Sequence, residues 1–205
     1  MQQPSGCCNV YTGKTDRYEG KGMEMFDIRT PEGEPTGEVK ERSAVHRDGD
    51  WHGTAHIWLV RRKNGKIEVL LQKRSRLKET FPGCYDASCA GHLSAGDSFI
   101  QGALRELQEE LGLEAKEEDL FLGGIYPCQV DEWFGGIHIL DREISAVYLY
   151  DKPVKEEELK LQEEEVEGVC WIEFERLKEL AAAGIFPWET DALEDAFRKR
   201  YRYGE

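Results

Sequence analysis

The sequence predicts an α/β sandwich, in which a mixed β-sheet lies between α-helices. Two observations point to this class. Short segments rich in β-branched and aromatic residues alternate along the chain with segments of helical periodicity. In addition, Asn64-Gly65 joins two apolar segments, an arrangement typical of a β-hairpin. We expect a single domain over residues 23–205, C-terminal helices included, after a flexible tail of residues 1–22.

The expected strands are apolar or alternating segments bounded by turn-forming residues. In chain order they are residues 23–30, Thr54–Arg62, Ile67–Gln72, Tyr85–Ala90, Leu120–Val130, Ile137–Tyr150 and Val166–Phe174. The turn formers at residues 31–38 follow the first strand and indicate a hairpin there.

Three helices are expected between and after these strands. The first spans Ser98–Leu111 and ends at Gly112, because glycine readily adopts the left-handed conformation that closes a helix. Leu104, Leu107 and Leu111 share one side of this helix, which predicts its core face. The other two helices are expected at residues 173–184 and 191–203.

The chain is strongly acidic, with 41 Asp and Glu against 27 Lys and Arg and a net charge of −14. Such a surface repels nucleic-acid backbones and anionic membranes, so neither is an expected partner. Two glutamate runs, residues 156–158 and 163–165, are expected to form a solvated face. No segment has the length of a membrane span or the apolar core of a signal peptide. The 6 cysteines lack zinc-type spacing and are expected to be reduced thiols in a cytoplasmic protein, monomer or homodimer.

Three carboxylates crowd one face of the first helix. Glu106, Glu109 and Glu110 stand at positions i, i+3 and i+4, so their side chains project together. Like charges at this spacing repel each other, and a divalent cation among them would remove the repulsion. Mg2+ and Mn2+ prefer oxygen ligands and commonly share them with substrate phosphates. The helix therefore predicts a site for Mg2+ or Mn2+.

The surrounding residues resemble the signature of the Nudix family, G-x(5)-E-x(7)-R-E-U-x-E-E-x-G-U, where U is aliphatic. The matching positions are Gly91, Asp97, Arg105, Glu106, Leu107, Glu109, Glu110, Gly112 and Leu113. One position departs from the signature, because Asp97 stands where the family has glutamate. The resemblance covers roughly residues 38–179 and implies the Nudix fold, a mixed sheet between helices.

The resemblance also implies roles for the signature residues in hydrolysis of a small-molecule diphosphate. The implied ligands to Mg2+ or Mn2+ are the carboxylates of Glu106, Glu109 and Glu110 and the main-chain carbonyl of Ala90. Glu106 is alternatively a base. Arg105 would orient the glutamates and pair with Asp97, whose side chain is shorter than that of the expected glutamate.

Outside the signature, the chain is similar to isopentenyl-diphosphate isomerases, which share the Nudix fold. The similarity implies a metal site with ligands at His46, His52, His92, Asp141 and Glu143. Asp141 and Glu143 alternate with Arg142, so on a strand both acids face one side. It also implies that the basic side chains of Arg42, Arg74 and Lys78 contact the substrate diphosphate, and that Glu143 is catalytic.

Two features favour hydrolysis over isomerisation. The catalytic cysteine of the isomerases would align with Ala90, and Cys89, one residue earlier, is expected to point to the opposite face of its strand. The isomerases also lack the full set of signature glutamates. The prediction is a Nudix hydrolase that cleaves an isoprenoid diphosphate or a nucleoside diphosphate derivative. The alternatives are an isomerase-like enzyme and a non-catalytic domain that senses a ligand.

Overall fold

The computed structural model describes residues 23–78, 81–134, 137–188 and 190–203. The predicted tail of residues 1–22 lies outside this described part. The strands are β1 (Met25–Arg29), β2 (Pro35–Glu41), β3 (Trp51–Lys63), β4 (Lys66–Arg74), β5 (Tyr85–Asp86), β6 (Cys89–His92), β7 (Leu120–Phe134), β8 (Ile137–Tyr150) and β9 (Val166–Glu173). The α-helices are α1 (Arg42–Asp48), α2 (Phe99–Leu111), α3 (Phe174–Ala182) and α4 (Asp191–Tyr201).

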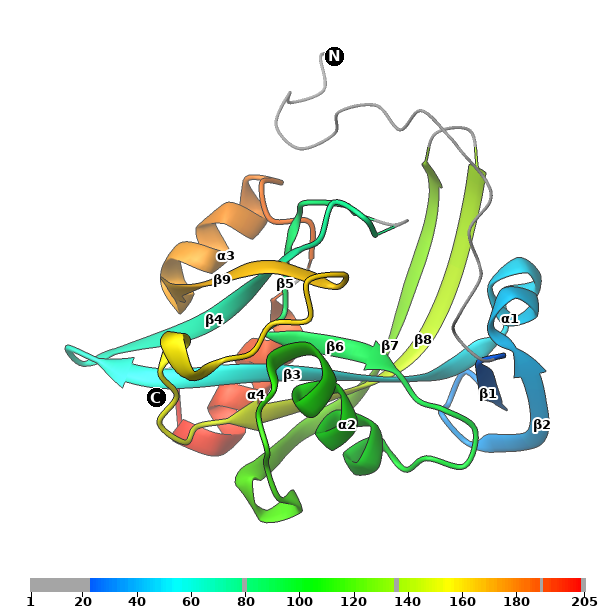
Figure 1. Ribbon diagram of the computed structural model, residues 1–205, viewed down its shortest axis with the longest axis horizontal. Coiled ribbons are helices and arrows are strands. Elements are labelled where there is room, and N and C mark those ends of the chain that lie inside the picture. The colour runs from blue at the N-terminus through cyan, green and yellow to red at the C-terminus, as the bar shows by residue number, and fades with distance from the viewer. Residues whose placement is uncertain (1–22, 79–80, 135–136, 189, 204–205) are drawn as a thin grey trace.

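Strand β3 is the centre of the sheet. It pairs in antiparallel fashion with β1, β4 and β6, and in parallel fashion with β8. Strand β4 extends the sheet to β5 and β9, and β8 extends it to β7. Because parallel and antiparallel pairs share one sheet and helices cover it, the structure has the predicted mixed α/β architecture (Figure 1).

Two apolar cores lie on the two faces of the sheet. On one face, Leu107 and Leu111 of α2 pack against Ile57 and Leu70. The other core contains Leu193 and Phe197 of α4 together with residues of α3 and the strands. Side chains of β3 and β6 that point to opposite faces of the sheet therefore meet different environments. The face on which a side chain lies decides which functional groups it can approach.

The predicted first helix is confirmed almost to the residue. Ser98 is its N-cap and accepts a hydrogen bond from the Gln101 backbone, while the Gln101 side chain binds the Ser98 backbone. Gly112 closes the helix in the left-handed conformation, with φ of 63°. Leu104 differs from the expectation, because it is only half-buried, and Ala103 is the fully buried residue beside it.

Several boundaries differ from the sequence-based expectation. The single predicted strand Tyr85–Ala90 is two short strands, β5 and β6. Strand β3 begins at Trp51 rather than at Thr54, because it pairs there with β8. Helix α1 was not predicted. Its 7 residues have no side-chain cap, so contacts with β1, β2 and β8 stabilise it instead.

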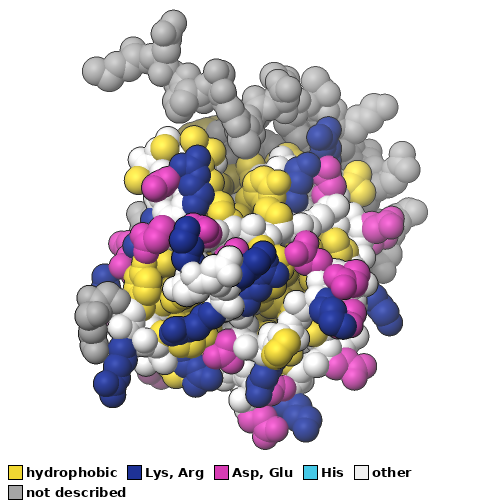
Figure 2. Space-filling view, turned by 90° about the vertical axis from the view of Figure 1, so that its left-hand side faces the viewer, with side chains coloured by type: hydrophobic (Ala, Val, Ile, Leu, Met, Phe, Trp, Pro, Cys, Tyr) yellow, Lys and Arg dark blue, Asp and Glu magenta, His cyan; other side chains and the backbone are white. Residues whose placement is uncertain are grey.

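Strands β7 and β8 form a ribbon that extends beyond the body of the sheet (Figure 1). The end of the molecule that carries α3 and the β3–β4 hairpin shows acidic and basic side chains side by side (Figure 2). Ion pairs such as Lys66–Glu173 and Arg176–Glu179 account for part of this mixture. Among the described helices, none combines the length and apolar character needed to cross a membrane.

Candidate active site

Four side chains from four elements converge on one point. His46 of α1, His52 of β3, His92 of β6 and Asp141 of β8 place one ligand-type atom each within 4.8 Å of one another. His52 Nε2 lies 3.5 Å and His46 Nε2 lies 3.8 Å from Asp141 Oδ1. Two ligands that share one ion at about 2.1 Å stand roughly 3–3.5 Å apart. The cluster is somewhat wider than this, so its side chains would move slightly inward to share one ion. We call these four residues the histidine cluster.

The converging atoms of the cluster have no other hydrogen-bond partner in the described part of the protein. This holds for Nε2 of all three histidines and for Asp141 Oδ1, and all four atoms are buried. Buried polar atoms normally find a partner, so four such atoms at one point need an explanation. A divalent metal supplies one, because imidazole nitrogen and carboxylate oxygen are common ligands of Zn2+, Mn2+ and Fe2+.

The cluster is also prepared to present nitrogen lone pairs. The backbone carbonyl of Asp50 lies 3.0 Å from His52 Nδ1, which places the proton on Nδ1 and leaves Nε2 as the acceptor. The buried ring of Phe26 stacks on His52 and His92 at centroid distances of 5.3 and 4.9 Å. Burial, with help from neighbouring positive charges, lowers the pKa of His46 to about 4. The histidines are therefore neutral at neutral pH, as metal ligands must be.

Glu143 lies at the edge of the cluster. Its Oε1 lies 3.8 Å from His92 Nε2, but the carboxylate is not among the four groups that converge. Burial raises the pKa of Glu143, whereas His56, His92 and His52 lower it by more, so the net pKa is lowered. Burial and the Glu143 charge together raise the pKa of Asp141 to about 7.

The glutamates of α2 approach β6 from the opposite face. Glu110 Oε2 lies 3.3 Å from both the backbone nitrogen of Ala90 and the side-chain nitrogen of Gln72. Burial, followed by the nearby Glu106 charge, raises the pKa of Glu110 to about 8. Because the Ala90 N–H points to Glu110 and not to β3, its carbonyl also faces away from β3. The predicted carbonyl ligand therefore lies on the same strand edge as Glu110.

Glu106 lies directly against the signature glycine. A Cβ atom added to Gly91 would overlap the Glu106 carboxyl group, so only glycine admits this carboxylate. Glu106 is buried, and burial is the main cause of its raised pKa. Glu109 differs, because its side chain is 54% exposed and is thus accessible to a ligand from solvent.

Arg105 connects the glutamates of α2 with His92 of the histidine cluster. Its Nη1 donates to Glu106 Oε1 at 2.6 Å and to Glu109 Oε2 at 3.3 Å. Its Nη2 donates to the backbone carbonyl of His92 at 2.8 Å. Asp97 lies 3.6 Å from Arg105 Nε, and that nitrogen has no hydrogen-bond partner among the described residues. The short Asp97 side chain thus reaches ion-pair distance but not hydrogen-bond distance.

The three predicted diphosphate-binding cations each contact a carboxylate. The pairs are Arg42 with Glu24 at 2.9 Å, Arg74 with Asp86 at 3.0 Å, and Lys78 with Glu165. Arg42 lowers the pKa of His46 and His92, which places its charge beside the cluster. Lys78 lowers the pKa of Glu110 in the same way. Arg42 therefore lies near the histidine cluster and Lys78 near Glu110.

Cys89 faces α2, as its position one residue before Ala90 predicts. The thiol is fully buried in the core of α2, on the opposite face of β6 from the Ala90 side chain. It nevertheless contacts Glu110, so it is not remote from the glutamates. Burial, followed by the charges of Glu110 and Glu106, raises its pKa well above the usual value. The thiol is therefore protonated and poorly suited to act as a nucleophile.

Two residues at the site have no role in the sequence-based prediction. Glu165 was expected on a solvated face, but its side chain is only 18% exposed and pairs with Lys78. His56 was not assigned, yet it contacts Glu143. His56 could have been found from β3, where His52, Thr54 and His56 alternate and therefore share one face.

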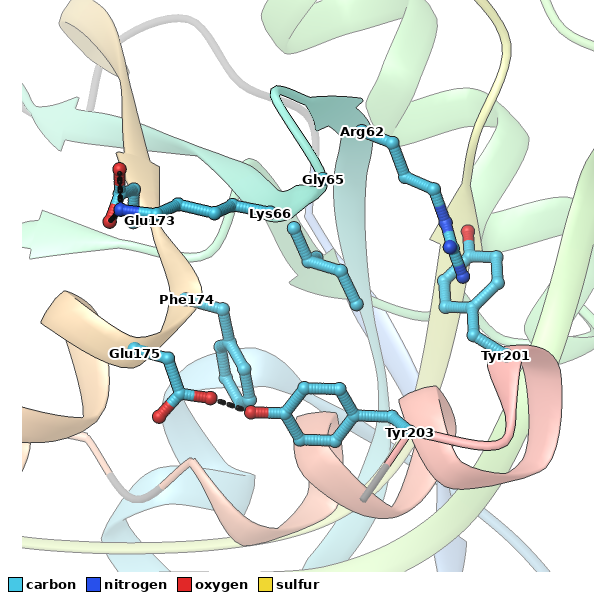
Figure 3. Close-up of a pocket in the computed structure, with 9 residues that line it drawn as sticks. Arg62, Gly65, Lys66, Glu173, Phe174, Glu175, Tyr201 and Tyr203 are labelled. Carbon is cyan, nitrogen blue, oxygen red and sulfur yellow. Dashed lines mark hydrogen bonds and ion pairs between the residues drawn. The ribbon is translucent and has the colours of Figure 1, made fainter. Parts of the chain in front are cut away.

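A cavity of about 410 Å³ lies elsewhere, between the β3–β4 hairpin and the C-terminal segment (Figure 3). Its lining includes Arg62, which is ten residues from His52, on the order of 30 Å along the strand. Lys66 pairs there with Glu173, and the Tyr203 hydroxyl pairs with Glu175. These groups pair with each other, and among the described residues no buried polar atom without a hydrogen-bond partner belongs to the lining of this cavity.

Comparison with known proteins shows which family the chain belongs to. The NUDIX domain family model matches residues 50–192. An uncharacterized Nudix hydrolase of Clostridium acetobutylicum is 40% identical over 75% of this chain and 72% of its own length. An isopentenyl-diphosphate Delta-isomerase of Saccharopolyspora erythraea is 26% identical over 81% of this chain and 82% of its own length.

The fold agrees with this assignment. A crystal structure from Deinococcus radiodurans superposes with a TM-score of 0.60 at 20% identity, covering 87% of this chain and all of that one. At this identity the likeness concerns the fold alone. The long family match and the 40% identical relative identify the chain as a member of the Nudix family.

Proposed function

We propose that the protein is a divalent-metal-dependent hydrolase that cleaves a diphosphate linked to another moiety. The observation that carries this proposal is the position of Glu110, which is buried against the Ala90 peptide with Glu106 beside it. Two adjacent buried carboxylates at a strand edge are stabilised by a cation. Membership in the Nudix family and the Clostridium acetobutylicum relative, which is named a Nudix hydrolase, support the same reaction class.

Each residue has a distinct task in this proposal. Glu106, Glu109, Glu110 and the Ala90 carbonyl would hold Mg2+ or Mn2+. When bound, the ion would supply charge that neutralises phosphate oxygens and lowers the pKa of water. Arg105 keeps Glu106 and Glu109 in place through its two hydrogen bonds.

Substrate binding falls to the basic side chains. Arg42 lies near the histidine cluster, Lys78 lies near Glu110, and Arg74 is paired with Asp86. When a diphosphate binds, its oxygens would take over part of the charge pairing that Glu24 and Glu165 provide. The substrate is accordingly a small molecule whose diphosphate is recognised by charge, either an isoprenoid diphosphate or a nucleoside diphosphate derivative.

The histidine cluster would hold a second divalent metal. Its four buried ligand atoms, three imidazole nitrogens and one carboxylate oxygen, have no hydrogen-bond partner among the described residues. This ligand set fits Zn2+, Mn2+ or Fe2+ better than Mg2+. This cluster is also the observation that favours the alternative function, because the similarity to isopentenyl-diphosphate isomerases implied these ligands. The buried, protonated Cys89 thiol and the methyl side chain of Ala90 argue against the isomerase reaction.

The test uses the full chain with Mg2+ and a panel of nucleoside diphosphate derivatives and isoprenoid diphosphates. We expect release of phosphate or a monophosphate, and a loss of about a thousandfold in Glu110→Gln. In heavy water, isopentenyl diphosphate should take up no deuterium. Deuterium uptake without phosphate release, sensitive to Cys89→Ala, would establish the isomerase instead. Wild-type turnover by Glu110→Gln would overturn the metal assignment, and any metal-dependent turnover excludes a ligand sensor.

A further inference from the structure

His56 lies on the face of the sheet that carries the histidine cluster. It shares the face of β3 that carries His52 and Thr54. In the antiparallel pair with β6 it stands opposite Ala90, and in the parallel pair with β8 it stands beside Val147. The small Ala90 side chain leaves room for the imidazole, which is 30% exposed. His56 is thus adjacent to the strands that carry both His92 and Glu143.

The Glu143 carboxylate uses its two oxygens differently. Oε2 lies 3.3 Å from Thr54 Oγ1, 3.3 Å from Ser145 Oγ and 3.6 Å from His56 Nε2. Oε1 lies 3.8 Å from His92 Nε2, on the side of the histidine cluster. One oxygen is therefore anchored to the sheet, and the other is directed toward the cluster.

The hydroxyl groups beside Glu143 Oε2 have few protons to donate to it. The hydroxyls of Thr54 and Ser145 are 2.7 Å apart and bond to each other, so one of them donates to the other. Each hydroxyl has a single proton, so together they offer only one to Glu143. The remaining polar group that faces Oε2 within the described part of the chain is His56 Nε2, at the ion-pair distance of 3.6 Å. His56 is therefore the further side chain that can hold this oxygen in place.

We propose that His56 is a positioning residue that holds Glu143 Oε2, so that Oε1 faces a metal ion in the histidine cluster. This proposal rests on the metal role of the cluster proposed above. Groups that orient a metal ligand in this way commonly change metal affinity by roughly 10–100-fold when they are removed. The effect of His56 is predicted to pass entirely through Glu143.

The test measures binding of Co2+ alone to untagged, metal-stripped full-length protein, by the absorption of the bound ion and by calorimetry. His56→Leu should weaken Co2+ binding by about tenfold or more. His56→Gln should restore most of the affinity, because its amide nitrogen can occupy the place of Nε2. His138→Gln is the matched control, since His138 is exposed and pairs with Asp131 on the ribbon, and it should leave Co2+ binding unchanged.

A double-mutant cycle separates positioning from general loss of structure. In the Glu143→Gln background, His56→Leu should cause no further loss of Co2+ affinity. An equal loss in both backgrounds, or wild-type affinity in His56→Leu, would overturn the proposal. His46→Ala serves as the reference. If it loses Co2+ and His56→Leu does not, only the His56 proposal fails; if His46→Ala binds Co2+ like the wild type, the metal role of the cluster fails as well.

Discussion

The glutamates of α2 and the histidine cluster lie on opposite faces of β6, and their polar atoms are partnered in different ways. Glu106 and Glu109 bond to Arg105, and Glu110 lies within hydrogen-bond distance of Gln72 and the Ala90 peptide. The converging atoms of the histidine cluster have no such partner in the described part of the chain. One group is therefore largely balanced by protein atoms, while the ligand-type atoms of the other have no such partner among the described residues.

This difference separates the contributions of the two groups to stability and to catalysis. Protein partners hold the glutamates of α2 in place without an ion, so their substitution should reduce turnover more than it changes folding. The cluster joins α1, β3, β6 and β8, so an ion bound there connects four elements. Such an ion stabilises the fold because the unfolded chain does not present a preformed site.

The largest expected effect on folding comes from the charge of Glu110. Its pKa is raised by burial from 4.5 to about 8 in the folded protein. The folded state thus favours the protonated form, and stability of the metal-free protein should fall as pH rises from about 4.5 through 8, by a few kcal/mol. Denaturant unfolding at several pH values should show that the free energy of unfolding of the wild type falls with pH. In Glu110→Gln, the part of this fall that comes from Glu110 should be absent. Identical slopes would mean that Glu110 titrates normally.

Transition-metal binding provides the second comparison. At a concentration one hundred times its dissociation constant, a ligand of the folded state adds about 2.7 kcal/mol to the free energy of unfolding. Co2+ should therefore raise the melting temperature of the metal-stripped protein, and Asp141→Asn should abolish the rise. Glu109→Gln, on the other face of β6, should retain it. If both variants lost the rise equally, one Co2+ ion would be bound jointly by the α2 glutamates and the histidine cluster, and the two groups would not be separate metal sites.

Gly91→Ala should have a smaller effect that is confined to the side of α2. The added methyl group overlaps the Glu106 carboxyl, so the glutamate or the strand must shift, at a cost of about 1–3 kcal/mol. Chemical denaturation measures this cost. Because the displaced Glu106 is an implied metal ligand, Mg2+-dependent turnover should fall while Co2+ binding to the histidine cluster is retained. An equal loss of Mg2+-dependent turnover and of Co2+ binding would show that β6 transmits the change from one of its faces to the other.

The glutamates of α2 were predictable because their spacing is local. Glu106, Glu109 and Glu110 belong to one helix, which was expected over Ser98–Leu111 with Gly112 as its end, and the structure adds the Ser98 cap. Arg105 was expected to orient glutamates, but its bond to the His92 carbonyl was not, because that contact depends on how the preceding loop folds back.

The histidine cluster could be proposed only through a resemblance. Its members are up to 95 residues apart, from His46 to Asp141, and periodicity does not indicate such distant contacts. His46 lies on α1, a helix formed through contacts with the strands and therefore not visible in the sequence pattern. The role of Glu165 was missed for a related reason, since only the path of its loop beside Ser75 and Glu110 brings it to Lys78.

Asp97→Glu should produce the smallest effect, and it tests how the two groups are joined through Arg105. In the present structure Asp97 lies 3.6 Å from Arg105 Nε, beyond hydrogen-bond range. The additional methylene of glutamate would close this gap and give Nε a partner. Because the pair is about one-third exposed, the gain in stability should stay below about 1 kcal/mol. In denaturant unfolding, the free energy of unfolding should be highest for Asp97→Glu, intermediate for the wild type and lowest for Asp97→Asn. The same order in Mg2+ affinity would show that Arg105 transmits the change to Glu106 and Glu109, whereas unchanged Mg2+ affinity would limit Asp97 to local support of the loop before α2.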